Sequence, residues 1–165
     1  LAPLAPHGVL VLPSPHALAT PDVFREADRL GLGRSSDELA QRRAQLLVAL
    51  AADARDPVPA DSARATTVSP LPPELLVNDL ERAARSLCPS IDDALAAARA
   101  AGADHALVSG SGPTVVGLFC GAGGPAAAEA AARELAARFP GATASQPVDA
   151  AFAAVRGLWH DEDRP

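Results

Sequence analysis

The sequence predicts a single α+β domain in which four strands form a mostly antiparallel sheet with helices on one face. Three observations support this class: short apolar runs of strand length, longer stretches with apolar residues at helical spacing, and a pair of strands followed by a helix and a strand near the C-terminal end. At 165 residues the chain has the length of about one domain. Its 48% hydrophobic and 21% charged residues are typical of a globular protein and argue against wholesale disorder.

The first predicted elements are a strand over residues 9–12 and a helix that begins at Thr20. The strand is a short apolar run that ends at Pro13, a pattern typical of a buried strand. The sequence Thr20-Pro21-Asp22 predicts a helix start, with Thr20 as the N-cap, a proline in the first turn and an acidic side chain facing the helix dipole. The helix should end near Gly31 or Gly33, because glycine adopts the left-handed conformation that terminates helices.

A second helix is predicted from Ser35, followed by a long loop. Ser35 and Glu38 have the spacing of a capping box, in which each side chain accepts a hydrogen bond from the backbone N–H of the other residue. Residues 53–73 are rich in proline and small polar residues, which predicts a loop of a length uncommon in compact domains. The helix that begins at Ser35 has an apolar stripe, which we expect to be buried. The stripe is formed by Leu39, Leu46, Leu47 and Leu50, with the stem of Arg43 beside it.

The second half of the chain is predicted to alternate helices with strands. Asn78 with Glu81 predicts the cap of one helix, and Ser90 predicts the cap of the next. The predicted helices cover residues 78–87, 90–101 and 125–139, and the predicted strands cover residues 105–109, 114–120 and 142–148. The strand over 114–120 is apolar on both faces and is expected at the centre of the sheet, whereas the apolar stretch 150–155 fits helix or strand. Four strands with helices between them favour a ferredoxin-like arrangement.

Composition excludes several classes of function. The net charge is −6, and all 14 Lys-or-Arg positions are arginine, so we expect no nucleic-acid partner, which would need a basic face. No apolar stretch reaches the roughly 18–20 residues of a membrane span and no secretory signal is visible, so we expect no membrane contact and a cytoplasmic location. Cys88 and Cys120 lie far apart without a neighbouring histidine, which predicts free thiols and no metal site.

A glycine-rich segment, Ser109-Gly110-Ser111-Gly112-Pro113-Thr114, lies between two predicted strands. Glycine at these positions permits a positive φ and lets a ligand or another loop approach the backbone without a Cβ in the way. Two interpretations follow: a tight hairpin turn, or a loop whose successive N–H groups accept an anion. The segment lacks the lysine of a P-loop and therefore does not predict a phosphate cradle of that type.

A second glycine cluster, Gly121-Ala122-Gly123-Gly124-Pro125-Ala126, follows a predicted strand and opens a predicted helix. It fits the G-x-G-x-x-A pattern of dinucleotide-binding sites. Such sites carry an acidic residue about 20 residues later at the end of the next strand, and here the nearest candidate, Asp149, lies beyond that strand. A plain connection from strand to helix is the favoured interpretation.

Phe24 is the aromatic side chain of greatest interest, since the chain has only four Phe and one Trp. On helical spacing, Phe24 sits one position past the apolar face that contains Val23. Periodicity alone leaves two alternatives open: a side chain that projects toward a cleft, and an ordinary core phenylalanine.

Three segments resemble parts of one enzyme family. Ser109–Thr114, preceded by the apolar residues 106–108 and followed by 115–119, resembles the third conserved motif of the GHMP kinases. Asn78-Asp79-Leu80-Glu81 resembles the helix start that precedes that motif, and residues 14–24 resemble the segment after the first C-terminal-domain strand in one branch of the family. The resemblance extends over residues 7–157, in matching order and spacing.

The resemblance implies an ATP-dependent transfer of the γ-phosphoryl group to an alcohol. In the branch concerned, the substrate is a cytidine diphosphate sugar alcohol, 4-diphosphocytidyl-2-C-methyl-D-erythritol, phosphorylated on its 2-hydroxyl in non-mevalonate isoprenoid precursor biosynthesis. ATP and Mg²⁺ are the cofactors of the full-length enzyme. The family's ATP loop, catalytic lysine and catalytic aspartate belong to its N-terminal domain, and this sequence contains no lysine.

We therefore expect a C-terminal, substrate-side domain whose partner is its own N-terminal domain. The sequence contains no methionine, so Leu1 is not expected to be a translation start. Residues 1–6 would be a remnant of the interdomain crossover, residues 7–157 the GHMP kinase C-terminal domain, and residues 158–165 a flexible tail. We expect no catalytic residue and no metal ligand in this chain, and we expect the fragment alone to bind no cofactor and to be inactive.

By position in the family, Phe24 would stack on the cytosine ring, and Thr20 and Pro21 would shape the same wall of the substrate pocket. Stacking of a base on an aromatic side chain is worth about 1–3 kcal/mol and keeps the base from water. The segment Ser109–Thr114 would form a glycine-rich active-site loop, with its central residues on the floor of the site beside the ATP loop.

A second class of function fits composition and periodicity equally well: a stand-alone ferredoxin-like ligand-binding or oligomerisation module. Such a module predicts a surface without an exposed apolar face. The kinase resemblance predicts the opposite, an exposed apolar patch where the N-terminal domain packs.

Overall fold

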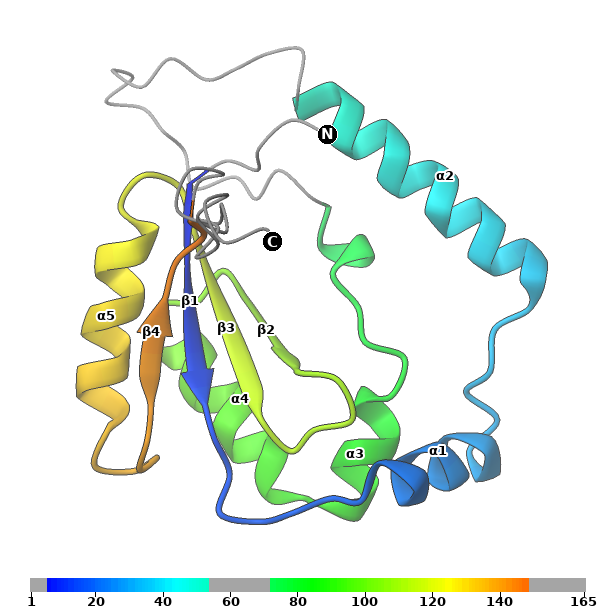
Figure 1. The fold of residues 1–165 in the computed structure, drawn as a ribbon, viewed down its shortest axis with the longest axis horizontal. Coiled ribbons are helices and arrows are strands. Elements are labelled where there is room, and N and C mark those ends of the chain that lie inside the picture. The colour runs from blue at the N-terminus through cyan, green and yellow to red at the C-terminus, as the bar shows by residue number, and fades with distance from the viewer. Residues whose placement is uncertain (1–5, 54–71, 149–165) are drawn as a thin grey trace, which may run out of the picture.

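A four-stranded antiparallel sheet is the centre of the computed structural model, which describes residues 6–53 and 72–148 (Figure 1). The strands are β1 (His7–Leu12), β2 (His105–Val108), β3 (Val115–Cys120) and β4 (Thr143–Ser145). Their spatial order is β2-β3-β1-β4, and each neighbouring pair is antiparallel. All four strands lie where the sequence predicts them, and the apolar strand β3 is central as expected.

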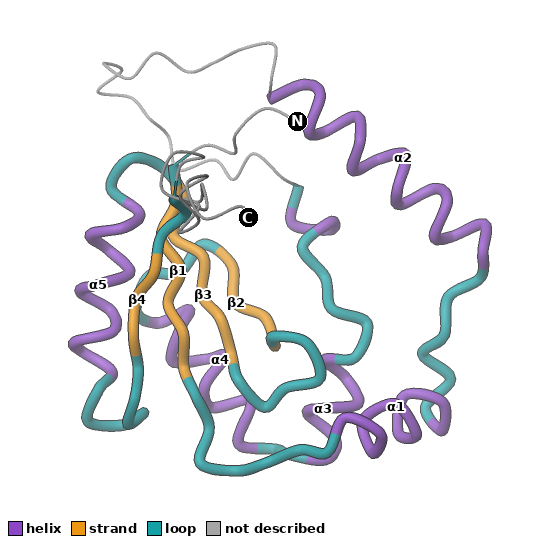
Figure 2. Tube along the Cα trace, in the orientation of Figure 1, coloured by secondary structure: helices purple, strands orange, loops and turns teal. Residues whose placement is uncertain are grey.

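Helices α4 (Ser90–Ala100) and α5 (Gly124–Leu135) cover one face of the sheet. Helix α1 (Thr20–Arg29) packs on α3 (Glu81–Leu87), near the loop that joins β2 to β3 (Figure 1). Helix α2 (Ser36–Asp53) and the 3₁₀ turn η1 (Pro73–Leu75) stand apart from the sheet (Figure 2). The strand connections and strand order are those of a ferredoxin-like fold, so the predicted α+β class with helices on one face is confirmed.

The hydrophobic core lies between the sheet and the helices α4 and α5. Side chains alternate along β1, so Leu10 and Leu12 are fully buried while the residues between them are only half-buried. Ile91 and Leu95 of α4, each 1% exposed, pack against this face. Burial of such side chains stabilises a fold by about 1.5–3 kcal/mol each. The core therefore fixes the sheet and α4 as the rigid base on which the loops stand.

The capping box predicted at the start of α2 is confirmed. The Glu38 N–H donates to the Ser35 hydroxyl at 3.2 Å, and the Ser35 N–H donates to the Glu38 carboxylate at 2.7 Å. The bond from the Ser35 N–H, and then a bond from the Ser35 hydroxyl at 3.0 Å, lower the pKa of the Glu38 carboxyl.

Three other predicted caps are wrong. Helix α1 begins at Thr20 itself, after Ala19 as N-cap, and no side chain caps it. Helix α3 begins at Glu81 rather than beside Asn78, and Ser90 is the first residue of α4 rather than its cap. A Ser, Thr or Asn near a helix start has the same sequence signature whether its side chain caps the helix or bonds a distant group. The Thr20 hydroxyl meets Ser111, and the Asn78 amide donates to the Val108 carbonyl while its oxygen accepts the nearby Leu80 N–H.

The apolar stripe of α2 is exposed, contrary to the prediction. Leu39 is 53% and Leu47 is 52% exposed, and Arg43 beside them is exposed as well. The reason is the position of α2, which contacts η1 and lies away from the sheet and its covering helices (Figure 1). Among the described elements, η1 is the main contact of α2, and Leu50 near the end of the stripe is half-buried.

Several predictions concern residues outside the described ranges. Residues 1–5, 54–71 and 149–165 include most of the interdomain remnant at 1–6 and most of the loop at 53–73. They also include the apolar stretch 150–155 and the tail 158–165. These stay predictions.

The second glycine cluster is a strand-to-helix connection, as its favoured interpretation predicts. Helix α5 begins directly on β1 and β3, so close that a side chain on either of two glycines would collide with backbone. A Cβ on Gly124 would lie 2.0 Å from the Phe119 carbonyl oxygen, and a Cβ on Gly8 would lie 2.3 Å from the Gly124 carbonyl oxygen. Glycine at these two positions is therefore a packing requirement of the fold.

Exchange of Gly124 for alanine is expected to destabilise the fold by about 2 kcal/mol or more, because the first turn of α5 must move off the sheet. The matched control is Gly123→Ala, where a Cβ would meet nothing within 4 Å. Urea unfolding of both variants measures the difference, and equal midpoints would contradict the close-packing explanation.

Candidate functional site

The glycine-rich loop at residues 109–114 joins β2 to β3 as a tight turn. The Ser109 N–H donates to the Thr114 carbonyl at 2.8 Å, and the Gly112 N–H donates back to the Ser109 carbonyl at 2.9 Å. These two bonds close the turn and fix its backbone. The hairpin interpretation is therefore confirmed for this segment.

The two glycines of the loop differ in their surroundings. Both have a positive φ, +57° at Gly110 and +76° at Gly112, where other residues are strained. A Cβ on Gly112 would lie 3.0 Å from Val108 and 3.3 Å from Ala84, so this glycine also packs the loop onto the core. A Cβ on Gly110 would meet nothing within 4 Å, so the backbone at Gly110 is open to a ligand.

A hydroxyl contact joins this loop to α1. Thr20 Oγ1 and Ser111 Oγ lie 2.9 Å apart, although the two residues are 91 positions apart in the sequence. Phe24 follows Thr20 by one helical turn and therefore lies on the same side of α1. The structure thus brings the segment that contains Thr20, Pro21 and Phe24 to the glycine-rich loop.

Phe24 is a surface residue. It is 53% exposed, while its neighbour Val23 is fully buried against the core. The alternative of an ordinary core phenylalanine is therefore wrong. An aromatic ring of this exposure offers a flat surface for a ligand that stacks.

Asn78 holds the glycine-rich loop from the other side. Its side-chain amide donates to the Val108 carbonyl at 2.8 Å and to the Gly110 carbonyl at 2.7 Å. Its oxygen accepts a hydrogen bond from the Leu80 N–H at 3.0 Å. The amide thus ties the segment before α3 to both β2 and the loop.

A buried carboxylate fixes α1 to α3. Among the described residues, Glu26 is the only buried charged residue. Its oxygens accept two hydrogen bonds from the Arg29 guanidinium and one from the Ser86 hydroxyl of α3, all at 2.6 Å. The bonds from Arg29, and then that from Ser86, lower the pKa of Glu26 from 4.5 to about 2. The carboxylate is therefore ionised at neutral pH and holds α1 in place.

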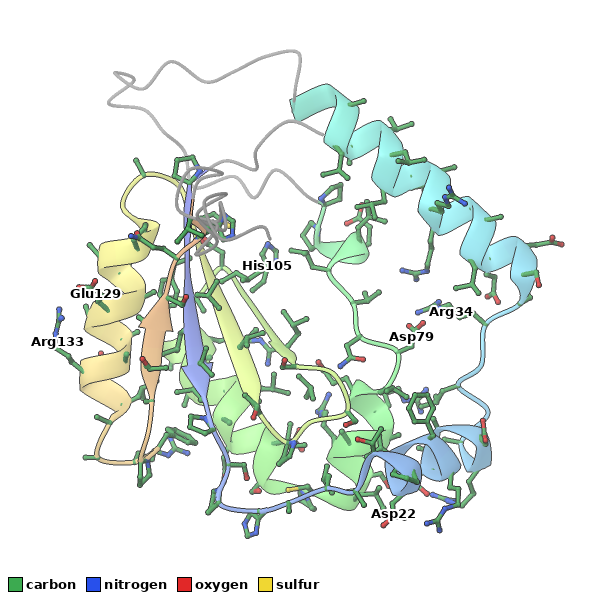
Figure 3. All side chains as sticks on the ribbon, viewed as in Figure 1. Asp22, Arg34, Asp79, His105, Glu129 and Arg133 are labelled. Carbon is green, nitrogen blue, oxygen red and sulfur yellow. The ribbon has the colours of Figure 1, made fainter. Side chains whose placement is uncertain are left out.

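A polar cleft of about 470 Å³ lies beside the segment 76–82. Arg34 and Asp79 point toward each other there, and Arg34 Nε donates to Asp79 Oδ2 at 2.6 Å (Figure 3). This bond lowers the pKa of Asp79 and raises that of Arg34. Three guanidinium groups face three carboxylates around the cleft, so it has no excess charge to select an ion; the charged lining residues are Arg34, Glu38, Asp79, Glu81, Arg82 and Arg99.

Within the described part of the chain, residues 6–53 and 72–148, no group of three His, Cys, Asp or Glu side chains is placed to hold a metal ion. No helix there is long and apolar enough to cross a membrane. Thr20 and the exposed Phe24, on one helix, together with the glycine-rich loop form the candidate site.

Sequence reasoning missed the residues that hold the site together. Glu26 has no signature in a single sequence, because its partner Ser86 lies 60 residues away. In the sequence, Asn78 is conspicuous only as part of a helix start. A side-chain amide can donate more hydrogen bonds than a helix cap uses, and this spare capacity is the signal that could have revealed its second role as a partner of the edge strand.

Comparison with known proteins gives the class to which this fold and loop belong. The family model described as "GHMP kinases C terminal" matches residues 68–141, which contain α3, α4, the β2–β3 hairpin and α5. The chain therefore carries a GHMP kinase C-terminal domain, as the resemblance of the glycine-rich loop implies.

Curated relatives bear one particular name, 4-diphosphocytidyl-2-C-methyl-D-erythritol kinase. The protein of Streptomyces coelicolor is 44% identical over 68% of this chain and 32% of its own length. That of Pseudarthrobacter chlorophenolicus is 38% identical over 82% of this chain and 37% of its own. That of Rhodococcus jostii is 38% identical over 92% of this chain and 41% of its own length. The chain spans less than half the length of these relatives.

Solved structures share the fold. A crystal structure of 4-(cytidine 5′-diphospho)-2C-methyl-D-erythritol kinase matches with a TM-score of 0.54 and 27% identity, over 88% of this chain and 44% of that one. Homoserine kinase from Cytophaga hutchinsonii matches with a TM-score of 0.50 and 17% identity, over 88% of this chain and 41% of that one. At this identity the match is a likeness of fold alone.

Replacement of Glu26 by glutamine tests the link between α1 and α3. Because the pKa of Glu26 is depressed from 4.5 to about 2, its stabilising contribution is complete above pH 4.5 and is lost as the pH falls toward 2. The difference in free energy of unfolding between the native chain and Glu26→Gln should therefore be largest at neutral pH and shrink below pH 4.5.

Urea titrations across this pH range measure that difference. Glu134→Gln, on the exposed side of α5, is the control and should change stability little at any pH. If the difference in free energy of unfolding between the native chain and Glu26→Gln stayed constant down to pH 3, this would contradict the role of the ionised carboxylate.

Proposed function

We propose that this chain is the substrate-side, C-terminal part of an ATP-dependent kinase that phosphorylates the 2-hydroxyl of 4-diphosphocytidyl-2-C-methyl-D-erythritol. The reaction belongs to non-mevalonate isoprenoid precursor biosynthesis and is placed in the cytoplasm. The GHMP kinase C-terminal match and the shared name of the curated relatives support this proposal. The main observation behind the proposal is the contact between the Thr20 and Ser111 hydroxyls. This contact brings the helix that bears the exposed Phe24 to the glycine-rich loop.

In this proposal Phe24 stacks on the cytosine ring of the substrate. The ring is half-exposed on a helix that is anchored by a buried carboxylate, so it can offer one fixed face to a base. Thr20 and Pro21, in the first turn of the same helix, shape the wall around it. A second aromatic side chain, from the rest of the longer protein, would cover the other face of the base.

The glycine-rich loop forms the floor of the proposed site. Gly110 leaves open space for a close approach of the ligand, and Ser111 stands beside Thr20, so the floor meets the base-binding wall. Gly112, packed on the core, keeps the floor rigid. Phosphoryl transfer depends mainly on positioning and charge stabilisation, and this chain would supply positioning.

In this proposal ATP and Mg²⁺ are bound outside this chain. The sequence has no lysine, and the described residues contain no group of three metal-ligating side chains. We assign the ATP loop, the Mg²⁺ ligands and the catalytic lysine and aspartate to an N-terminal domain, the proposed partner of this chain. On this proposal the chain alone binds neither cofactor and does not catalyse the transfer.

The exposed leucines of α2 favour the kinase over a stand-alone module. Leu39, Leu46 and Leu47 form an apolar stripe on a helix that stands off the sheet. A stand-alone ligand-binding or oligomerisation domain of this size predicts no such face, whereas a domain that packs against another part of its own polypeptide does.

Removal of the Phe24 ring should weaken ligand binding without unfolding the chain. We expect Phe24→Ala to reduce the affinity for cytidine 5′-diphosphate by about tenfold or more, because stacking contributes about 1–3 kcal/mol per base. Phe24→Tyr, which retains the ring, should bind within about threefold of the native chain. Leu39→Ala, a control at the same 53% exposure on α2, should leave the affinity unchanged.

Isothermal titration calorimetry with cytidine 5′-diphosphate measures these affinities, and circular dichroism verifies the fold of each variant. An affinity of Phe24→Ala equal to that of the native chain, or a native chain that does not bind the nucleotide, would contradict the proposed function.

A further inference from the structure

We infer that Asn78 is the positioning residue of the glycine-rich loop: its side-chain amide sets the peptide between Gly110 and Ser111 so that the Ser111 N–H is presented to a phosphate oxygen of the ligand. The identity of the ligand rests on the proposed function, whereas the effect of Asn78 on the loop does not.

The Asn78 side chain makes hydrogen bonds through both the nitrogen and the oxygen of its amide. One nitrogen donates to two carbonyl oxygens, those of Val108 at 2.8 Å and Gly110 at 2.7 Å. The side-chain oxygen accepts the Leu80 N–H at 3.0 Å, which fixes the rotamer and the orientation of the amide. Only a planar amide combines two donors on one atom with an acceptor on the other.

Peptide geometry then sets the direction of the N–H that follows each bonded carbonyl. In a planar trans peptide the C=O and the next N–H point in opposite directions. The peptide between Val108 and Ser109 shows this geometry. Its carbonyl accepts a hydrogen bond from Asn78, and its N–H, on the opposite side, donates to the Thr114 carbonyl at 2.8 Å. The peptide from Gly110 to Ser111 is oriented by the same amide, so the Ser111 N–H points away from Asn78.

The Ser111 N–H has no acceptor among the described residues. It belongs to the residue whose hydroxyl meets Thr20, and it follows a glycine that leaves open space beside the backbone. A fixed N–H donor in an open position binds an anionic oxygen well, because charge-assisted hydrogen bonds are about twice as strong as neutral ones. The diphosphate of a cytidine nucleotide offers such an oxygen.

Asn78→Asp gives the sharpest test, because it keeps the shape of the side chain and replaces the donor nitrogen by an oxygen. At pH 7.5 a carboxylate would face two carbonyl oxygens, which repels the loop and raises the pKa of the introduced carboxyl. On acidification the protonated carboxyl regains a donor. Asp79→Asn, one position further, breaks the ion pair with Arg34 but leaves the Asn78 amide in place and is the matched control.

Two-dimensional ¹H–¹⁵N spectra of the full chain follow the loop without any ligand. For Asn78→Asp we expect the Gly110 and Ser111 amide resonances to be displaced at pH 7.5 and to return toward the native positions as the pH falls to about 5. In Asp79→Asn both resonances should keep their native positions. Undisplaced resonances, displacement that acid does not reverse, or equal displacement in the control would overturn the inference.

The affinity for cytidine 5′-diphosphate, compared with that of the native chain at the same pH, adds the functional readout. We expect a loss of about tenfold for Asn78→Asp at pH 7.5, with recovery at pH 5, and no loss for Asp79→Asn. Native affinity in Asn78→Asp at pH 7.5 would overturn the inference. A native chain that binds no nucleotide counts against the proposed function, while the loop resonances still decide the role of Asn78.

A measurement on the native chain covers the case in which the variant does not fold. The Ser111 amide should exchange with solvent rapidly in the free chain and become protected at least tenfold when cytidine 5′-diphosphate saturates it. Slow exchange without the nucleotide, or unchanged exchange with it, would contradict the assignment of this N–H to the ligand.

Discussion

Strand β2 lies at the edge of the sheet, and its outward-facing peptide groups need partners that no neighbouring strand supplies. Side chains provide them: Arg99 donates to the Ala106 carbonyl at 3.2 Å, the Val108 N–H donates to the Glu81 carboxylate at 3.1 Å, and Asn78 donates to the Val108 carbonyl. This requirement fixes where α3 begins, because Asn78 and Glu81 must both reach the edge. The position of the glycine-rich loop follows from it.

Helix α3 is thus the element that joins the two halves of the candidate site. The segment just before it holds the loop through Asn78, and its last turn holds α1 through the bond from Ser86 to Glu26. The net contribution of one hydrogen bond to stability is small, so no single one secures the arrangement. Together they bring α1, with Thr20 and the exposed Phe24, to the glycine-rich loop.

The sequence predicted the parts of the structure that depend on local patterns. Strand β3 was recognisable because its residues are apolar on both faces, and the capping box of α2 because Ser35 and Glu38 are three positions apart. The sequence does not reveal the distant partners of Thr20 and Asn78, which are Ser111 and Val108, because nothing local indicates them. The stripe of α2 was expected to be buried because amphipathicity predicts that a face will be covered, without indicating which element covers it.

The central claim is that residues 20–24 and 109–114 form one binding surface for a cytidine nucleotide. A titration of the ¹⁵N-labelled full chain with cytidine 5′-diphosphate, followed by chemical shifts, tests it most directly. The account expects perturbations concentrated in both segments with a common dissociation constant, and none at the glycine cluster 121–126 or in the cleft beside Arg34. Perturbations confined to one segment, or centred on that cluster or cleft, would contradict it.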